Sequence, residues 1–275
     1  MRRTTLAAAM LLAFAAPAFA QKLSVGLDGT FAPHGMPKLG GGLEGFNVDM
    51  AMEIGKRLGR EVEVVGQEFS GLIPGLNAKR FDFIVAPTTV TKERAENLLF
   101  TEGYMGTDYM FLVKKDAADI RQLEDLKGKV VAVNRGSIYD TWARENAEKF
   151  GFTVESYGTQ PDAVQAVLAG RAYANLAGHT GSLWAAKRNP LLKASYTVKT
   201  GLVWSIPFRK DDTEMRNKVE AVVECMKKDG TFARLAETWL GYKPTGDDLL
   251  VTPLPGFGQP GFTGHDPTAH TPTCR

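Results

Sequence analysis

The sequence predicts an α/β fold divided into two lobes, and three features of the chain support this prediction. Short apolar runs alternate with amphipathic helical segments, as in a largely parallel sheet with helices on its faces. The alternation stops and starts again near residue 129, so the chain contains two such units. With 275 residues, 44% of them hydrophobic and 23% charged, the chain is long enough for both units. We therefore expect a cleft between two lobes, a usual place for a ligand.

The first unit has the order strand, helix, strand, helix, strand. Its clearest element is a helix over 46–58, because apolar residues recur at every fourth position from Phe46 to Leu58, and Gly59 suits the position after a helix end. The other expected elements are strands over 23–27, 61–65 and 81–86 and a helix over 72–79.

The second unit repeats this pattern. Its expected elements are strands over 129–133, 152–156 and 173–177 and helices over 137–149 and 160–169. Helices over 213–228 and 231–240 follow. Beyond Gly241 the periodicity is lost. Residues 246–275, rich in Pro, Gly and Thr, are expected to form an extended tail without a fold of its own.

The first twenty residues have the features of a cleaved signal peptide. Arg2 and Arg3 form a basic start, 6–16 is a short apolar run, and 18–20 reads Ala-Phe-Ala, a small-x-small cleavage signal. No later run of about 18 apolar residues follows, so we expect a soluble mature protein exported to the periplasm.

The charge of the expected mature chain argues against nucleic acid as a partner. Removing residues 1–20 removes two of the 33 basic residues and none of the 31 acidic ones, which leaves 31 minus 31, or zero. A neutral chain without a concentrated basic stripe has no general attraction to nucleic acid or to an anionic membrane surface.

The two cysteines are Cys225, in an expected helix, and Cys274, near the end of the tail. Export to an oxidising compartment permits a disulfide, which would pin the tail to the body of the protein. The alternative is one buried thiol and one free tail thiol. The metal-capable side chains of the tail match no closed zinc pattern, so we expect neither a metal nor a cofactor.

Six segments in a fixed order resemble a known family. They are VGLDGTFAP, LEGFNVDMAMEIGKRLG, FSGLIPGLNAKRFDFIVAPTTVTKER, LEDLKGKVVAVNRGS, AVLAGRA and MKKDGTFARLAETWLG. Together they cover about residues 22–243 and are similar to family 3 of the extracellular solute-binding proteins, the periplasmic binding proteins of polar amino acid ABC transporters. The ligand-binding cores of ionotropic glutamate receptors share that fold.

The resemblance implies a type II periplasmic-binding-protein (Venus-flytrap) fold in which two crossovers join the lobes. Lobe 1 would comprise about 22–106 plus 208–245, and lobe 2 about 110–203, with 246–275 as the tail. It also implies a monomer that closes around a small-molecule ligand by hinge motion and delivers it to a membrane permease.

The segment from Pro87 to Arg94 matches the carboxylate site of the family. Thr91 suits a helix N-cap, which places Arg94 in the first turn, and a helix start favours an anion. The planar guanidinium binds a carboxylate through two parallel hydrogen bonds. The resemblance implies that Arg94 and Thr89 bind the ligand carboxylate and that the Pro87 carbonyl accepts from an ammonium. The alternative is a surface arginine on a solvated helix.

Four further residues fall at ligand positions of the family. Phe31 and Phe69 match aromatics that sandwich the ligand side chain, with core packing as the alternative. Asp28 matches a contact to the distal end of the ligand, or is a turn residue that caps its own backbone. Ser137 matches a lobe 2 contact to the carboxylate, a role compatible with that of a plain helix N-cap.

The chain departs from the family at Gly178. Most members carry an acidic residue there, which pairs with the α-ammonium of an amino acid, and glycine cannot do so. An ammonium in a closed cleft without an anion is costly. We favour an unusual ligand over a standard amino acid. His179, beside the gap, is either a ligand contact or the polar start of a helix, and His34 is expected at the rim of the cleft.

Three interpretations of this departure remain open. The first is a ligand without an α-ammonium, such as a hydroxy or keto acid. The second is a methylated ammonium held by aromatic rings, with Tyr139 and Trp204 as candidates beside Phe31 and Phe69. The third is an acidic partner elsewhere in the chain, either Asp28 or Asp140.

Two other functions compete with transport. Some proteins of this fold are periplasmic enzymes, for example dehydratases of cyclohexadienyl acids, but the sequence shows no nucleophile–base pair, metal constellation or phosphate loop. We therefore expect a protein that is not an enzyme. The second alternative is an accessory protein of a periplasmic dehydrogenase, for which the tail would serve as a docking element.

Overall fold

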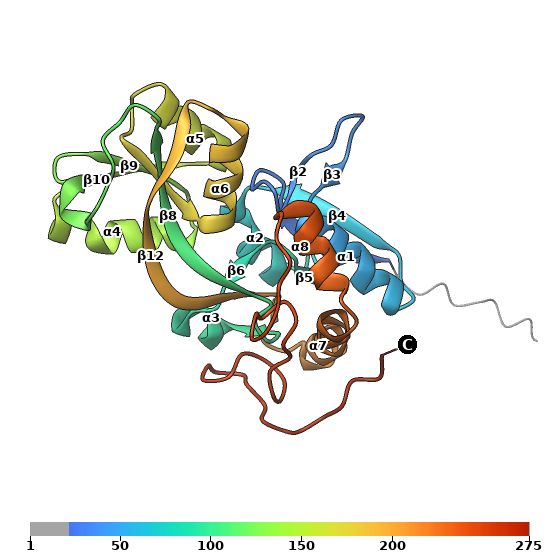
Figure 1. Cartoon of the computed structure of the whole chain (residues 1–275). Coiled ribbons are helices and arrows are strands. Elements are labelled where there is room, and N and C mark those ends of the chain that lie inside the picture. Colours follow the sequence, from blue (N-terminus) through green and yellow to red (C-terminus); the bar gives the residue numbers. More distant parts are fainter. Residues whose placement is uncertain (1–21, 275) are drawn as a thin grey trace, which may run out of the picture.

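The computed structural model describes residues 22–274, and it has two lobes joined by long curved strands (Figure 1). The predicted signal peptide lies outside the described residues. The two-lobed α/β fold predicted from the sequence is confirmed. The predicted lobe boundaries stay a prediction. No helix among residues 22–274 combines the length and apolar character needed to cross a bilayer.

The first lobe is built on a parallel sheet with strand order β4-β1-β5. Its strands are β1 (Leu23–Asp28), β4 (Val62–Gln67) and β5 (Phe83–Ile84). Its helices are α1 (Phe46–Arg57), α2 (Phe69–Asn77), α3 (Lys92–Asn97), α7 (Thr213–Lys228) and α8 (Thr231–Trp239). Two small antiparallel pairs accompany them, β2 (Met36–Pro37) with β3 (Leu43–Glu44) and β7 (Leu98–Phe100) with β13 (Pro207–Arg209).

The second lobe contains most of a six-stranded sheet of order β10-β9-β11-β8-β12-β6. Its strands are β6 (Thr88–Thr89), β8 (Met105–Lys114), β9 (Val130–Asn134), β10 (Thr153–Tyr157), β11 (Ala174–Gly178) and β12 (Leu192–Ser205). Its helices are α4 (Ile138–Phe150), α5 (Gln160–Leu168) and α6 (His179–Arg188), with a short 3₁₀ turn at Leu123–Leu126.

The strands β8 and β12 pair along most of their length and curve from one lobe toward the other (Figure 1). Where they enter the first lobe, the two crossover segments run side by side: the Thr101 N–H donates to the Ile206 carbonyl at 3.1 Å and the Tyr104 N–H to the Trp204 carbonyl at 2.9 Å. The sequence pattern did not predict these two strands. The short strand β6 joins the end of β12, so the Pro87–Arg94 segment is fixed at the junction of the lobes.

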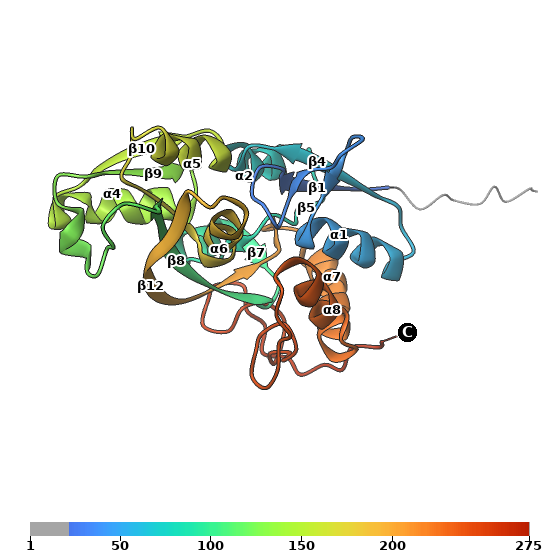
Figure 2. The same ribbon diagram turned by 45° about the horizontal axis from the view of Figure 1, so that its top comes forward.

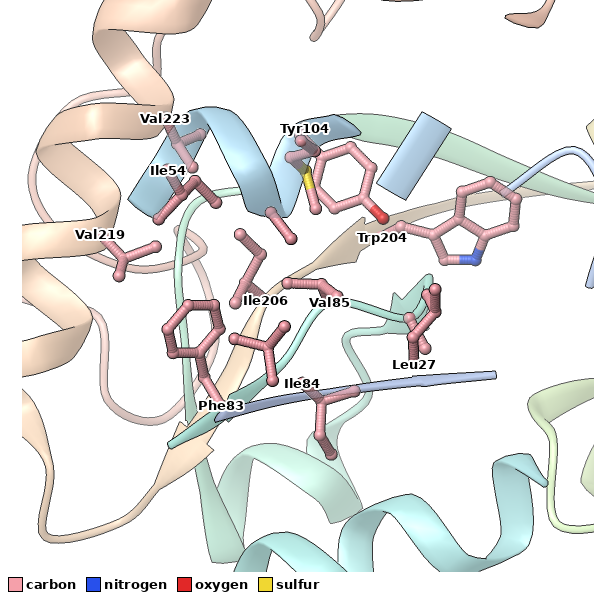
Figure 3. Packing of buried hydrophobic residues seen from close by; sticks show 14 of the residues in the cluster. Leu27, Ile54, Phe83, Ile84, Val85, Tyr104, Trp204, Ile206, Val219 and Val223 are labelled. Atoms are coloured by element: carbon pink, nitrogen blue, oxygen red, sulfur yellow. The ribbon is translucent and has the colours of Figure 1, made fainter. Parts of the chain in front are cut away.

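Each lobe has its own apolar core. In the first lobe, the β1 and β5 side chains pack against α1 and α7, and Tyr104, Trp204 and Ile206 of the crossovers complete this core (Figure 3). In the second lobe, Phe111, Val131 and Leu176 of the sheet pack beneath α4. Because Tyr104, Trp204 and Ile206 belong to the first core, the crossover segments are anchored on that side.

The tail has a defined place beside α7 in both views (Figures 1 and 2), although it contains no helix or strand between residues 246 and 274. A disulfide joins Cys225 of α7 to Cys274, as predicted. The Gly258 N–H donates to Glu220 at 2.7 Å, and Gln259 Oε1 accepts from the Gly103 N–H of the crossover at 2.8 Å. The Pro- and Gly-rich composition did not indicate these contacts.

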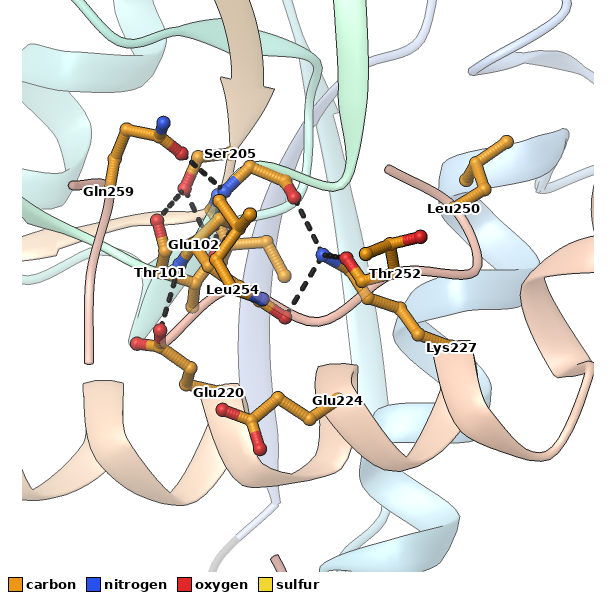
Figure 4. A network of polar contacts seen from close by, with 12 residues as sticks. Thr101, Glu102, Ser205, Glu220, Glu224, Lys227, Leu250, Thr252, Leu254 and Gln259 are labelled. Atoms are coloured by element: carbon orange, nitrogen blue, oxygen red, sulfur yellow. Dashed lines mark hydrogen bonds and ion pairs between the residues drawn. The ribbon is translucent and has the colours of Figure 1, made fainter. Parts of the chain in front are cut away.

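A buried polar network joins the tail, α7 and the crossover (Figure 4). Lys227 Nζ lies 2.9 Å from Glu102 Oε1 and donates to the Gly103 carbonyl at 2.8 Å and to the Thr252 carbonyl at 3.3 Å. Glu102 accepts from the Leu254 N–H of the tail. Both charged side chains are buried, so the pair satisfies charges that would otherwise be costly.

Candidate functional site

A small, partly open cavity lies where the two lobes meet. The volume that the centre of a water molecule can reach is about 20 Å³. One water molecule needs roughly 10–15 Å³ on this measure, so the cavity has room for one or two. The lining residues are Asp28, Phe31, Phe69, Pro87, Thr89, Arg94, Asn134, Ser137, Ile138 and Tyr139. The first six come from the first lobe or its junction and the last four from the second. Several of them lie at the carboxyl ends of β1 and β9 or at the start of α4, the usual ligand edge of an open α/β sheet.

Arg94 supplies a cation to this cavity. Thr91 caps α3 as predicted, since its hydroxyl accepts from the Arg94 N–H at 3.2 Å. Arg94 Nη1 donates to the Thr89 carbonyl at 3.0 Å, and the guanidinium carbon lies 5.6 Å from the centre of the Phe69 ring. Burial lowers the pKa of Arg94, yet arginine stays protonated at any working pH.

Within residues 22–274 no carboxylate lies at ion-pair distance from this guanidinium. Glu93 is a minor influence on Arg94, and Tyr109 and Tyr139, whose pKa values are raised by burial, are uncharged at neutral pH. The helix α3 has six residues, so its dipole adds little, and the guanidinium is the one cationic side chain among the described residues that line the cavity.

Phe31 and Phe69 both line the cavity and both are buried, so both rings pack in the core, and their contact with a ligand stays a prediction. The Phe31 ring stacks on His34 at 5.4 Å and meets Trp204 edge to face at 6.2 Å. Helix α2 begins at Phe69, three residues before the predicted start, which brings this ring to the cavity.

Asp28 is a turn residue and also joins the lobes. Its Oδ1 accepts from the Thr30 N–H at 2.9 Å and from the Thr30 hydroxyl at 2.6 Å. Its Oδ2 accepts from Nδ2 of Asn134, across the lobe boundary, at 3.1 Å. Burial raises the pKa of Asp28. Asn134 was not predicted as a site residue, although it is the polar residue that ends the buried strand β9.

Ser137 lines the cavity, but its hydroxyl serves the backbone. It donates to the Asn134 carbonyl at 2.6 Å and accepts from the Asp140 N–H at 3.2 Å, as the N-cap of α4. Asp140 accepts from Gly136, Arg144 and Ser156, and it is not among the lining residues. The structure therefore gives no support to Asp140 as a ligand partner.

The space beside Gly178 is filled by two aromatic side chains. A methyl group at Gly178 would lie 2.5 Å from the Tyr139 hydroxyl oxygen and 2.8 Å from Cζ2 of Trp204. Tyr139 lines the cavity, whereas Gly178, His179 and Trp204 do not. His179 starts α6 and lines two hollows outside the cavity, both of which are more open than the cavity itself.

His34 is fully buried, so the expectation of a rim histidine is wrong. Asn47 Nδ2 donates to the Val85 carbonyl at 2.6 Å and to the Tyr104 hydroxyl at 2.9 Å, which makes Asn47 Oδ1 the acceptor from His34 Nδ1–H at 2.8 Å. His34 Nε2 therefore accepts from the hydroxyl of Thr180, on α6 of the second lobe, at 2.7 Å. This hydrogen bond links the two lobes.

From the burial of His34 we predict that the stability of the protein depends on pH. Burial lowers the pKa of His34 to about 3, against 6.5 in the unfolded chain. Below pH 6.5 the unfolded state binds a proton that the folded state does not, so stability is lost as the pH falls. Between pH 7 and pH 5 the free energy of unfolding should fall by about 2 kcal/mol more in the wild type than in His34→Gln. Urea unfolding at the two pH values measures this, and equal pH dependence in both proteins would contradict it.

Comparisons with known proteins agree with this architecture. The model of the bacterial extracellular solute-binding proteins, family 3, matches residues 23–242. The L-cystine-binding protein TcyJ of Escherichia coli K12 is 31% identical over 80% of this chain and 82% of its own length. The histidine-binding periplasmic protein of the same strain is 29% identical over 88% of this chain and 98% of its own.

A solved structure described as an ancestral arginine-binding protein bound to arginine matches with a TM-score of 0.77. It is 34% identical and covers 81% of this chain and 100% of its own. The family model spans most of the chain, and the sequence and structural relatives agree with it. The chain belongs to the bacterial extracellular solute-binding proteins, family 3.

Proposed function

We propose that this protein binds a small, polar, carboxylate-bearing solute in the periplasm and delivers it to the membrane permease of an ABC transporter. The observation that carries the proposal is the Arg94 guanidinium, which faces a cavity between the lobes without a carboxylate partner among the described residues. The relatives named for cystine, histidine and arginine bind solutes that bear a carboxylate, which agrees with this assignment.

In this proposal the lobes close around the ligand, and two contacts support a closed arrangement. Asp28 accepts from Asn134, and His34 accepts from Thr180, so each lobe holds the other beside the cavity. A ligand carboxylate bound to Arg94 and Thr89 of one lobe, and contacted by the other, would add its binding energy to this closure.

Binding without catalysis fits the lining of the cavity. Among residues 22–274, the lining contains one carboxyl group, that of Asp28, and no histidine, cysteine or lysine. Both Asp28 oxygens already accept hydrogen bonds, so a general acid or base would have to leave the contacts that fix it. We further propose that the protein is a monomer and that it is not an enzyme.

Removing the guanidinium should abolish binding. In Arg94→Gln, a bound carboxylate loses two charge-assisted hydrogen bonds, and the Kd should rise at least about 100-fold. Calorimetry and thermal shift on protein refolded free of ligand measure this, with lactate, alanine, histidine, arginine and cystine as probes. Arg121→Gln, at an exposed position of the second lobe, is the matched control and should bind like the wild type. A probe that binds Arg94→Gln as tightly as the wild type would refute the assignment.

A further inference from the structure

The space beside Gly178, next to the cavity, is filled by Tyr139, which lines the cavity, and by Trp204, which does not. The position at which the family carries an acidic residue is Gly178, and any side chain there meets the Tyr139 hydroxyl and the Trp204 ring at 2.5 and 2.8 Å. Both aromatic side chains are buried. The centre of the Trp204 ring lies 5.0 Å from the centre of the His34 ring, which holds it in place. An acidic side chain therefore cannot stand at Gly178 unless Tyr139 or Trp204 moves, and this position offers no anion to an α-ammonium.

The remaining acid of the cavity is poorly suited to replace it. Asp28 Oδ1 accepts two hydrogen bonds from Thr30, which uses both of its lone pairs. Its Oδ2 accepts from Asn134, and this contact joins the lobes. Burial further disfavours the charged form of Asp28. An α-ammonium that Asp28 does not neutralise would be costly in this largely buried site, where Arg94 already supplies a cation.

The second lobe instead presents an acceptor without a donor. Asn134 Oδ1 is buried and has no hydrogen-bond partner among residues 22–274, because the amide of this side chain is oriented by the bond from its Nδ2 to Asp28. Asn134 lines the same cavity as Arg94. A buried acceptor of this kind requires a donor, and a ligand hydroxyl supplies one without adding a charge.

We infer that the ligand is a short hydroxy carboxylate, with its carboxylate on Arg94, its hydroxyl donating to Asn134 Oδ1, and no ammonium on the carbon next to the carboxylate. This inference rests on the proposed function and narrows it to one chemical class.

The test compares ligands that share a carbon skeleton. Calorimetry on ligand-free, refolded mature protein would use lactate, alanine and propionate, then glycolate against glycine and glycerate against serine. β-Alanine tests an ammonium farther from the carboxylate, and glycine betaine tests a methylated ammonium. Each hydroxy acid should bind at least about tenfold tighter than its α-amino counterpart, because only the ammonium is left without an anion.

A variant isolates the hydroxyl contact. In Asn134→Ala, the preference for lactate over propionate should disappear, whereas any loss of lobe contact with Asp28 affects both ligands equally. Asn146→Ala, on α4 and bonded only to the Trp142 carbonyl in its own helix, is the matched control and should keep the preference.

The outcomes separate the two proposals. If an α-amino acid, β-alanine or betaine binds more tightly than the hydroxy acids, and binding still depends on Arg94, the hydroxy-acid inference is overturned and the carboxylate site stands. If lactate and propionate bind equally to the wild type, the assignment of Asn134 is overturned. If no probe binds the wild type, both proposals fail.

Discussion

Replacing Lys227 by methionine should lower the free energy of unfolding by about 3–5 kcal/mol. Lys227 is the cation that balances Glu102, 2.9 Å away, in a region closed to water. Burial already raises the pKa of Glu102, and the lysine opposes that shift. Without Lys227 the carboxylate is left beside two further buried acids, Glu220 and Glu224. Urea unfolding followed by tryptophan fluorescence measures the loss.

Two variants serve as controls for this prediction. Lys228→Met changes the exposed neighbouring residue on the same helix and should alter stability by less than about 0.5 kcal/mol. The double variant Glu102→Gln and Lys227→Met removes both charges and should be more stable than Lys227→Met alone. If the double variant is the least stable of the three, the charge pair is not the source of the effect.

Removing the disulfide should cost about 4 kcal/mol, because Cys225 and Cys274 close a loop with a sequence separation of 49. The bond limits the freedom of the unfolded chain and holds the tail on α7. We expect Cys225→Ala with Cys274→Ala to unfold at a lower urea concentration than the wild type. Reductant should shift the wild type to the same midpoint and leave the variant unchanged. If the urea midpoint of the wild type does not change under conditions in which reductant cleaves the bond, this prediction is wrong.

The fold could be predicted from the sequence wherever local periodicity reflects packing. Helix α7 has the predicted bounds of 213–228, and α1 ends one residue before its predicted end. The strands β8 and β12 were not predicted, since half-buried polar and apolar residues mix along β12 as it curves between the lobes. Such strands are determined by pairing with distant partners more than by their own pattern.

The site was predictable in part for the same reason. The Arg94 segment is contiguous in sequence, so its cap and its cation could be recognised together. The contacts between lobes join residues far apart: Asp28 and Asn134 are separated by 106 positions, and His34 and Thr180 by 146. No local pattern encodes such pairs. Gly178 was recognised as a departure, but only the structure shows which side chains fill its space.

The filled space at Gly178 also restricts how specificity can change by mutation. A change to Asp at this position adds a side chain where Tyr139 and Trp204 already lie, so it destabilises the protein before it can pair with an ammonium. Replacing Trp204 by a smaller residue first would remove a ring that packs against Phe31 and His34. A mutational path to an amino-acid site of the usual kind therefore needs at least two changes, and each one alone is harmful. Packing thus keeps this position as glycine against single substitutions.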